Sequence, residues 1–272
     1  TTEIYTVLTS SAASDVYKRQ PLSPADPSDP SDPSGPSTTA NSSRPGSQPR
    51  GGSPSLSSSS KGLDIEQCKT MLVAIADAII AAEPILTDAD RALGDGDHGI
   101  GMQRGFTALK KQVGTSRFHT LRDLFQTAGD ALLSTMGGAS GVVFGSLFLA
   151  GGRTLQDASY FGSHELAHLL NQSLNDVMKR GGAKPGDKTM IDALAPAADA
   201  ATSSIHATLI DSITATAAAA EAGKQASCDM IATMGRAKTL GTKTLGLPDA
   251  GAISVSIILN TMANFIRQTD PA

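Results

Sequence analysis

The stretch that decides the fold class is "MLVAIADAIIAAEPILTDADRALGDGDHGIG", Met71 to Gly101. Its last part has the G-x-G-x-x-G spacing of a dinucleotide-binding loop, from Gly94 to Gly99. Such a loop must follow a buried strand, but the residues before it are rich in alanine and carry apolar side chains at helical spacing. These apolar residues are Leu72, Ile75, Ile79 and Ile80. The stretch therefore predicts a helix that leads into the loop, and it excludes the dinucleotide fold.

Two acidic residues lie inside this glycine loop. Asp95 and Asp97 alternate with the glycines, and Asp90 precedes them near the end of the predicted helix. Bare carboxylates repel phosphate, whereas a divalent cation held by them attracts it, as Mg²⁺ does when it joins protein carboxylates to substrate oxygens. An EF-hand is excluded, because Phe106 stands where its last glutamate is needed. We expect a metal site; the alternative is a surface turn whose aspartates cap a helix.

The rest of the chain divides by composition near residue 61. Residues 1–60 contain a Pro/Ser/Asp/Gly-rich segment, from which we expect a disordered linker. The stretch "SSAASDVYKRQ" resembles translated sequencing-adapter sequence, so residues before Pro21 are assigned no function. Residues 61–272 show helical periodicity throughout, and predict an all-α domain. Predicted helical stretches cover residues 121–136, 163–180, 190–225 and 252–268.

Charge and cysteine content limit the partners and the compartment. The net charge of -4, without a Lys/Arg cluster, disfavours nucleic acid and acidic membranes. We see neither a membrane span nor a signal peptide. Cys68 and Cys228 are far apart and are expected to be free thiols, which fits a reducing, cytoplasmic location.

Three further segments have the composition of ligand-binding turns. Gly137 to Gly141 precede an apolar helix, which predicts either an anion site at a helix N-terminus or close helix packing. "GDKTM" is not a P-loop, because Asp187 separates Gly186 from Lys188; Asp187 or Thr189 is expected to cap a helix. In "MGRAKTLGTKTLGLPDAGAISV", Arg236 is a candidate phosphate ligand or a solvated residue at a helix end.

In this order, the four segments resemble the L subunit, or nucleotide-binding domain, of dihydroxyacetone kinases. The family pattern contains "GDGDHG", "GG.SG", "GDKTM.DAL.P" and "GRA..LG..S.G..D.GA", and the resemblance covers about residues 63–268. It implies an eight-helix antiparallel barrel that holds ATP or ADP at one end through two Mg²⁺ ions. It also implies a separate K-type domain or subunit that holds dihydroxyacetone, and a homodimer formed through that domain where the two are fused.

The resemblance carries the family's binding positions onto this chain. The metal ligands fall on Asp90, Asp95 and Asp97. The nucleotide contacts fall on His98, Gly99, Ile100, Gly101, Ala139, Ser140, Gly181, Met190, Arg236, Pro248, Asp249 and Ala250. Two positions depart from the family pattern: Gly101 replaces an asparagine, and Lys243 replaces an arginine, so a bidentate contact becomes a point charge.

The implied activity is a glycerone kinase reaction, in which this domain donates the γ-phosphoryl group of ATP to dihydroxyacetone. No residue is assigned a certain catalytic role. Arg236 and the helix end at Ser140 are expected to steady the phosphates, and His98 to bind and not to act as a base. The alternatives are an L subunit that keeps ADP as a cofactor in a phosphotransferase-linked kinase, a non-catalytic nucleotide-binding regulator, and a related fatty-acid kinase domain with another partner.

Overall fold

The computed structural model describes residues 62–269, so the linker predicted for residues 1–60 lies outside the described part. The elements, in chain order, are α1 (Ile65–Ala81), α2 (Glu83–Leu93), α3 (His98–Thr115), α4 (Leu121–Thr135), α5 (Gly138–Arg153), α6 (Ser163–Gly181), α7 (Ile191–Ser203), α8 (Leu209–Ala226), η2 (Ser227–Asp229), η3 (Ala237–Thr244) and α9 (Ala250–Thr269). Within residues 62–269, a single β-bridge, between Leu63 and Phe161, is the one departure from helix and loop.

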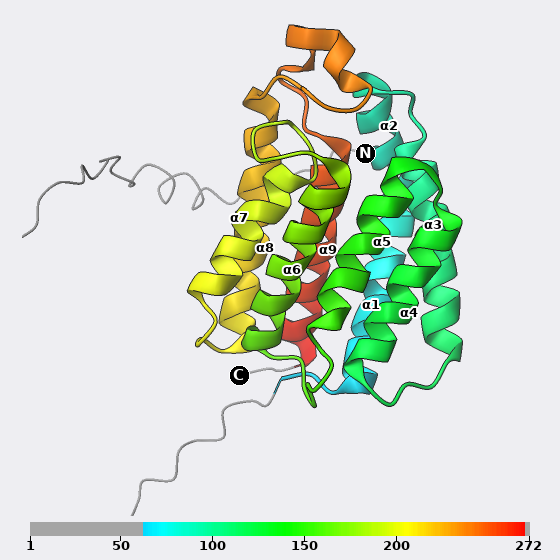
Figure 1. The fold of residues 1–272 in the computed structure, drawn as a ribbon, viewed down its shortest axis with the longest axis vertical. Helices are drawn as coiled ribbons and strands as arrows, with labels where there is room; N and C mark the ends of the chain where they lie inside the picture. The colour runs from blue at the N-terminus through cyan, green and yellow to red at the C-terminus, as the bar shows by residue number, and fades with distance from the viewer. Residues whose placement is uncertain (1–61, 270–272) are drawn as a thin grey trace, which may run out of the picture. The chain divides into compact units, whose positions relative to one another are not determined.

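Eight of the helices form a closed ring. Successive neighbours in contact are α1, α3, α4, α5, α6, α7, α8 and α9, and α9 returns to α1 (Figure 1). The eight-helix barrel predicted from the sequence is therefore confirmed. The short helix α2 stands outside the ring, where it packs on α3 and contacts α9. Short connections between successive helices make neighbours antiparallel.

Small residues allow the ring to close tightly between α4 and α5. A Cβ atom on Gly145 would lie 2.9 Å from the Cβ of Leu133, and one on Gly129 would lie 2.6 Å from the Cγ of Leu149. Helix packing therefore requires glycine at both positions.

Helix α9 has the length and composition of a membrane-spanning helix, but 61% of its most apolar window is buried in the protein.

Two predicted helical stretches are interrupted. The stretch from Met71 to Leu93 bends by 56° between α1 and α2, because Pro84 lacks an N–H and stands in the first turn of a new helix. The stretch 190–225 breaks after Ser203, since Thr208 caps α8 by accepting from the Asp211 N–H at 3.2 Å. Neither interruption has a glycine to mark it.

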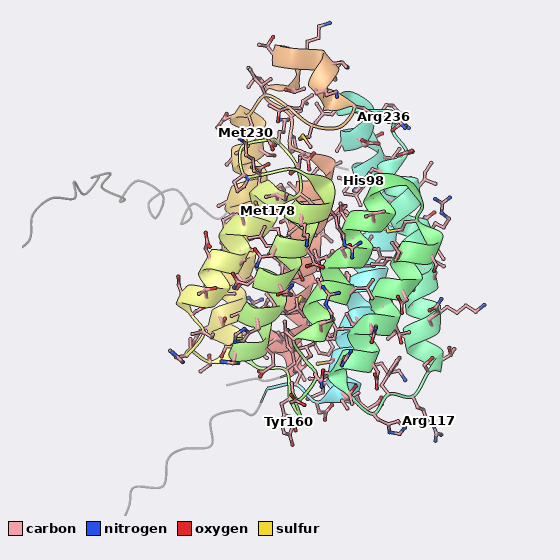
Figure 2. All side chains as sticks on the ribbon, in the orientation of Figure 1. His98, Arg117, Tyr160, Met178, Met230 and Arg236 are labelled. Atoms are coloured by element: carbon pink, nitrogen blue, oxygen red, sulfur yellow. The ribbon has the colours of Figure 1, made fainter. Side chains whose placement is uncertain are left out.

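The antiparallel ring determines where the four motifs meet. They occupy the α2–α3, α4–α5, α6–α7 and α8–α9 connections, which are alternate connections along the chain. Alternate connections of an antiparallel bundle lie at the same end. His98 and Arg236 accordingly lie toward one end of the barrel, whereas Arg117 and Tyr160 lie at the other (Figure 2).

Candidate functional site

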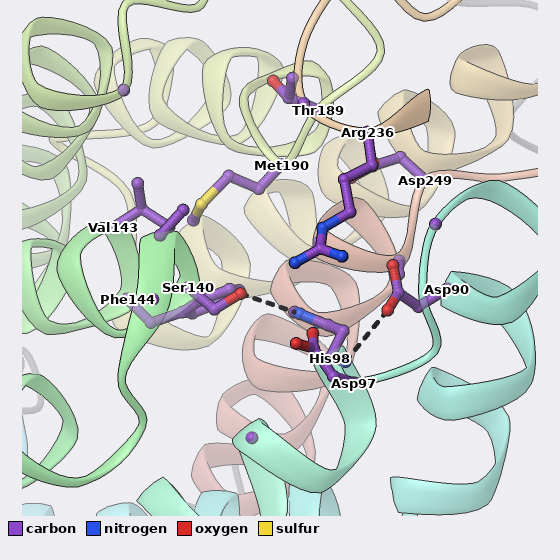
Figure 3. Close-up of a pocket in the computed structure, with 18 of the residues that line it drawn as sticks. Asp90, Asp97, His98, Ser140, Val143, Phe144, Thr189, Met190, Arg236 and Asp249 are labelled. Carbon is purple, nitrogen blue, oxygen red and sulfur yellow. Dashed lines mark hydrogen bonds between the residues drawn. The ribbon is translucent and has the colours of Figure 1, made fainter. Parts of the chain in front are cut away.

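The four motif connections enclose a cavity of about 730 Å³. This volume falls within the range of about 300–1,000 Å³ that is typical of small-molecule sites. The wall contains acidic side chains on one side and apolar side chains, including Val143, Phe144 and Met190, on another (Figure 3). A ligand with a charged end and an apolar end fits this division.

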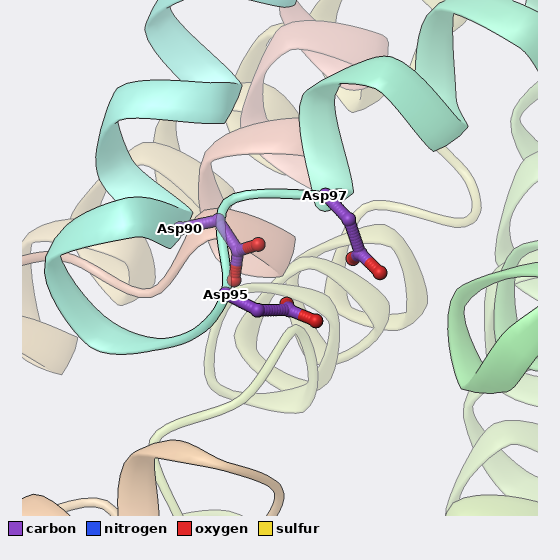
Figure 4. A group of neighbouring side chains, drawn as sticks. All are labelled: Asp90, Asp95 and Asp97. Atoms are coloured by element: carbon purple, nitrogen blue, oxygen red, sulfur yellow. The ribbon is translucent and has the colours of Figure 1, made fainter.

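Three carboxylates gather at the α2–α3 connection. Asp90 lies in the last turn of α2, and Gly96, with φ of 77°, reverses the chain so that Asp95 and Asp97 return toward it. Each of the three offers an oxygen atom, and these oxygens lie within 4.8 Å of one another (Figure 4). Asp90 is half-buried and the other two are exposed. One Asp90 oxygen also accepts the His98 N–H at 3.1 Å, which fixes its orientation.

The chemistry of this cluster fits a hard divalent cation. All three donors are carboxylate oxygens, the ligand type that Mg²⁺ prefers, and Mg²⁺ completes its shell with water and substrate oxygens. Two exposed carboxylates leave such a cation open to a substrate. The residues present therefore fit magnesium bound together with a phosphate ligand.

His98 joins three elements beside the carboxylates. It begins α3, its Nε2 lies 2.9 Å from Ser254 Oγ on α9, and its Nδ1 lies 3.4 Å from Ser140 Oγ on α5. The Ser254 hydroxyl donates to a backbone carbonyl, so it accepts from Nε2–H, and Nδ1 is left as an acceptor. Burial lowers the pKa of His98, and the neighbouring carboxylates offset this only in part. A neutral histidine in this position orders the wall of the site.

A second wall is the N-terminus of α5. Gly137 and Gly138 have φ values of 72° and 57°, a region that favours glycine, and a Cβ atom on Gly138 would meet no heavy atom within 4 Å. Backbone conformation, and not packing, therefore requires glycine at Gly138. The first-turn N–H groups of α5 have no partner within the helix and adjoin the cavity beside Ser140. Anions bind at such helix ends.

The α8–α9 connection supplies positive charge and a half-buried acid. The Arg236 guanidinium forms an ion pair with Asp95, so it lies directly beside the carboxylate cluster. Asp249 precedes α9, and its carboxyl accepts the Ala252 N–H at 2.8 Å, as a helix cap. Burial raises the pKa of Asp249 to about 7.

Most of the residues that the sequence predicts for the site line this one cavity. They are Asp90, Asp95, Asp97, His98, Ile100, Gly101, Ala139, Ser140, Gly181, Met190, Arg236, Asp249 and Ala250. Gly99 and Pro248 are not in the cavity wall. A Cβ atom on Gly99 would lie 2.3 Å from Thr87 Oγ1, so this glycine allows α3 to pack on α2. Lys243 is exposed on η3 and does not reach the wall either.

The predicted helix cap at Asp187 or Thr189 is wrong for Asp187. Its carboxylate accepts from the Lys184 N–H at 2.8 Å and from the Thr233 hydroxyl at 2.6 Å. Asp192, inside α7, instead accepts the N–H groups of Gly186 and Thr189. The Thr189 hydroxyl accepts only the Ile191 N–H, at 3.2 Å. The first-turn N–H groups of Asp192 and Ala193 donate to the carbonyls of Thr189 and Met190, so they are not free to be capped by Asp187.

Several cavity residues are absent from the sequence prediction. Arg104, Phe144, Lys188, Thr189 and Met234 all line the wall. Phe144 lies four residues after Ser140 on α5, a spacing that places both on the same helix face. For buried Lys188 the only sequence signal is its place in the "GDKTM" segment.

Comparison with protein families gives a match to the DAK2 domain over residues 92–264. Among curated proteins, the chain is 37% identical over 179 residues to "PEP-dependent dihydroxyacetone kinase 1, ADP-binding subunit DhaL" of Listeria innocua, covering 65% of this chain and 85% of that protein. It is also 37% identical over 203 residues to "L-erythrulose kinase" of Pectobacterium atrosepticum, covering 71% of this chain and 33% of that protein.

A solved structure has the same fold. The dihydroxyacetone kinase of C. freundii in complex with AMP-PNP and Mg²⁺ superposes with a TM-score of 0.60 and 25% sequence identity, covering 81% of this chain. This chain spans 38% of the length of that kinase.

Proposed function

The chain belongs to the DAK2 domain family, and from this membership we propose that it is the nucleotide-binding, phosphoryl-donating part of a dihydroxyacetone-type kinase. The observation that carries the proposal is the carboxylate cluster at the mouth of the cavity, with oxygens within 4.8 Å of one another. A triphosphate cannot approach these acids without a cation, and with one it is held firmly. The relatives named as ADP-binding subunits of a kinase, and the related kinase structure with AMP-PNP and Mg²⁺, support this reading.

We propose the following roles for the chain's own residues. Asp90, Asp95 and Asp97 hold two Mg²⁺ ions, which neutralise charge on the transferred phosphoryl group when bound. The N-terminus of α5 at Ser140 and the guanidinium of Arg236 donate to phosphate oxygens. The apolar wall that contains Val143, Phe144 and Met190 receives the base.

The phosphoryl acceptor is proposed to come from another protein unit. Phosphoryl transfer requires donor and acceptor oxygens in line at near-contact distance. The four motif connections supply a donor site, and a K-type domain or subunit would present dihydroxyacetone, or a related ketose, at its mouth. A cytoplasmic location is proposed as well; the unpaired state of Cys68 and Cys228 supports a reducing compartment.

The test is calorimetric titration of the full chain with AMP-PNP, with and without Mg²⁺. Binding is expected with Mg²⁺, and a loss of at least about tenfold in affinity is expected with EDTA, because unshielded carboxylates repel the phosphates. Asp97→Asn should weaken binding in Mg²⁺. Asp77→Asn, which removes an exposed carboxylate on α1, is the control and should leave binding unchanged. Equal affinity with and without Mg²⁺ would refute the metal site.

A second candidate function is favoured by the names of two relatives, the ADP-binding subunits of Listeria innocua and Escherichia coli. In that form ADP remains bound as a cofactor and is rephosphorylated in place. Slow ADP dissociation, measured by rapid dilution of the loaded chain, would indicate the cofactor form. Exchange on the scale of seconds would indicate ATP as a substrate.

A further inference from the structure

Lys188 combines two unfavourable features in a loop beside the cavity. Among residues 62–269 it is the one non-glycine residue with positive φ, at 60°. Its side chain is also buried, with 3% of the residue exposed. Strain at such a φ costs free energy in a non-glycine residue, and a buried ammonium costs more unless it is hydrogen-bonded. Both costs persist only where the surrounding structure compensates for them.

The compensation is a pair of hydrogen bonds to backbone carbonyls. Lys188 Nζ donates to Ser227 O and to Leu247 O, each at 2.5 Å. No carboxylate in the described part of the chain lies within ion-pair distance of this ammonium. Burial lowers the pKa of Lys188, and the nearby carboxylates of Asp249, Asp192 and Asp229 oppose this effect.

The carbonyls of Ser227 and Leu247 stand at the two ends of one long connection between α8 and α9, the excursion 227–247. Residues 227–247 leave the end of α8, run through η2 and η3, and return before α9. Between Cys228 and Leu247 only Ala232 and Thr244 are buried, so apolar packing contributes little to the position of this segment. Hydrogen bonds must therefore position it. At its base the Gly246 N–H donates to Cys228 O at 2.8 Å, and Lys188 joins the adjacent carbonyls of Ser227 and Leu247.

Asp187, the residue before Lys188, holds the same excursion at Thr233, away from its two ends. Asp187 O accepts the Thr233 N–H at 3.2 Å, and its carboxylate accepts the Thr233 hydroxyl at 2.6 Å. Arg236 follows Thr233 by three residues and is largely exposed, with its guanidinium beside Asp95. The dipeptide Asp187–Lys188 thus connects the α6–α7 loop to the segment that carries the candidate phosphate ligand.

We propose that Lys188 is a positioning residue, which holds the excursion 227–247 so that Arg236 reaches the phosphates of the nucleotide. This inference rests on the proposed function of the cavity. Lys188 acts through Arg236 and the backbone and need not touch the ligand. The predicted signature is energetic coupling between Lys188 and Arg236 in nucleotide binding.

The test is a double-mutant cycle of Lys188→Gly and Arg236→Ala, read by calorimetry with Mg-ADP on the full chain. Glycine suits a φ of 60°, so the loop keeps its backbone conformation while the ammonium is lost. Lys188→Gly alone is expected to weaken binding about tenfold, and less than about twofold when Arg236 is already alanine. Restoring the charge with Lys188→Arg should recover part of the affinity.

Hydrogen exchange without nucleotide gives an independent readout. Peptides from residues 229–247 should exchange faster in Lys188→Gly than in the unchanged chain, whereas peptides from α4 should not. Lys69→Met is the matched control, because Lys69 Nζ also donates to a backbone carbonyl, that of Ser116, which follows α3. It should leave Mg-ADP binding and the exchange of the excursion unchanged.

The outcomes separate this inference from the proposed function. If the unchanged chain fails to bind Mg-ADP, the proposed function is refuted. If it binds, but the losses from Lys188→Gly and Arg236→Ala are additive and the excursion exchanges at its normal rate, the positioning role is refuted.

Discussion

Gly101 and Gly114 lie on the same helix, α3, but at different distances from the site: Gly101 is in its first turn and Gly114 near its end. A Cβ atom on either would meet no heavy atom within 4 Å, so packing requires glycine at neither position. Glycine inside a helix costs about 1 kcal/mol relative to alanine. Gly101 lines the cavity and Gly114 does not. The structure thus gives a local reason to look for a ligand at Gly101, where the family pattern has asparagine.

Gly101→Ala and Gly114→Ala separate helix propensity from ligand contact. Both are expected to raise the free energy of unfolding, by up to about 1 kcal/mol, measured by urea denaturation. Only Gly101→Ala is expected to change Mg-ADP binding, because its methyl group enters the cavity. Unchanged binding in Gly101→Ala would mean that the ligand does not approach the first turn of α3.

Helix α9 illustrates how an element of the barrel contributes to the site. Its N-terminus adjoins the cavity through Ala250 and Gly251, and its body packs against α1, α7 and α8. The cap of this helix is Asp249, whose pKa burial raises from 3.8 to about 7. The charges of Asp192 and Lys188 act on it in opposite directions. The helix start therefore titrates near neutral pH.

Asp249→Asn tests this titration. Because the pKa is higher in the folded state, folded protein binds more protons than unfolded protein between about pH 4 and about pH 7, and stability falls as the pH rises through this range. Asparagine keeps the cap acceptor and cannot ionise. Its free energy of unfolding relative to the unchanged chain should be higher at about pH 8 than at about pH 5.

The control for this pH series is Asp199→Asn, an exposed aspartate on α7. Its effect on stability should vary much less over the same pH range. A pH-independent difference for Asp249→Asn would contradict a raised pKa at the start of α9.

At the scale of the whole molecule, the barrel brings every motif to one end and leaves the cavity open there. The relatives include both subunits of similar length and longer kinases of which this chain spans about a third. Both arrangements fit a donor domain that works with an acceptor domain. On the proposed function, the chain's activity is a property of an assembly.

The purified chain is expected to bind Mg-ATP but to form no dihydroxyacetone phosphate alone. Turnover should appear when a K-type subunit is added and should disappear with Asp97→Ala, which removes a proposed metal ligand. A coupled assay of dihydroxyacetone phosphate measures this. Robust turnover by the isolated chain would contradict the division into donor and acceptor units. Binding without turnover beside any cognate partner would favour the regulator.

The sequence by itself determined the helical class, the position of the acidic loop, and, through the order of its motifs, the family and the barrel. Helical periodicity and glycine spacing are local properties, so they can be read without coordinates. Only the tertiary structure decided that Gly99 packs on α2 while Gly101 faces the cavity. The role of Lys188 likewise depends on Ser227 and Leu247, which are distant in sequence. Such contacts depend on how the ring closes, and no local pattern encodes them.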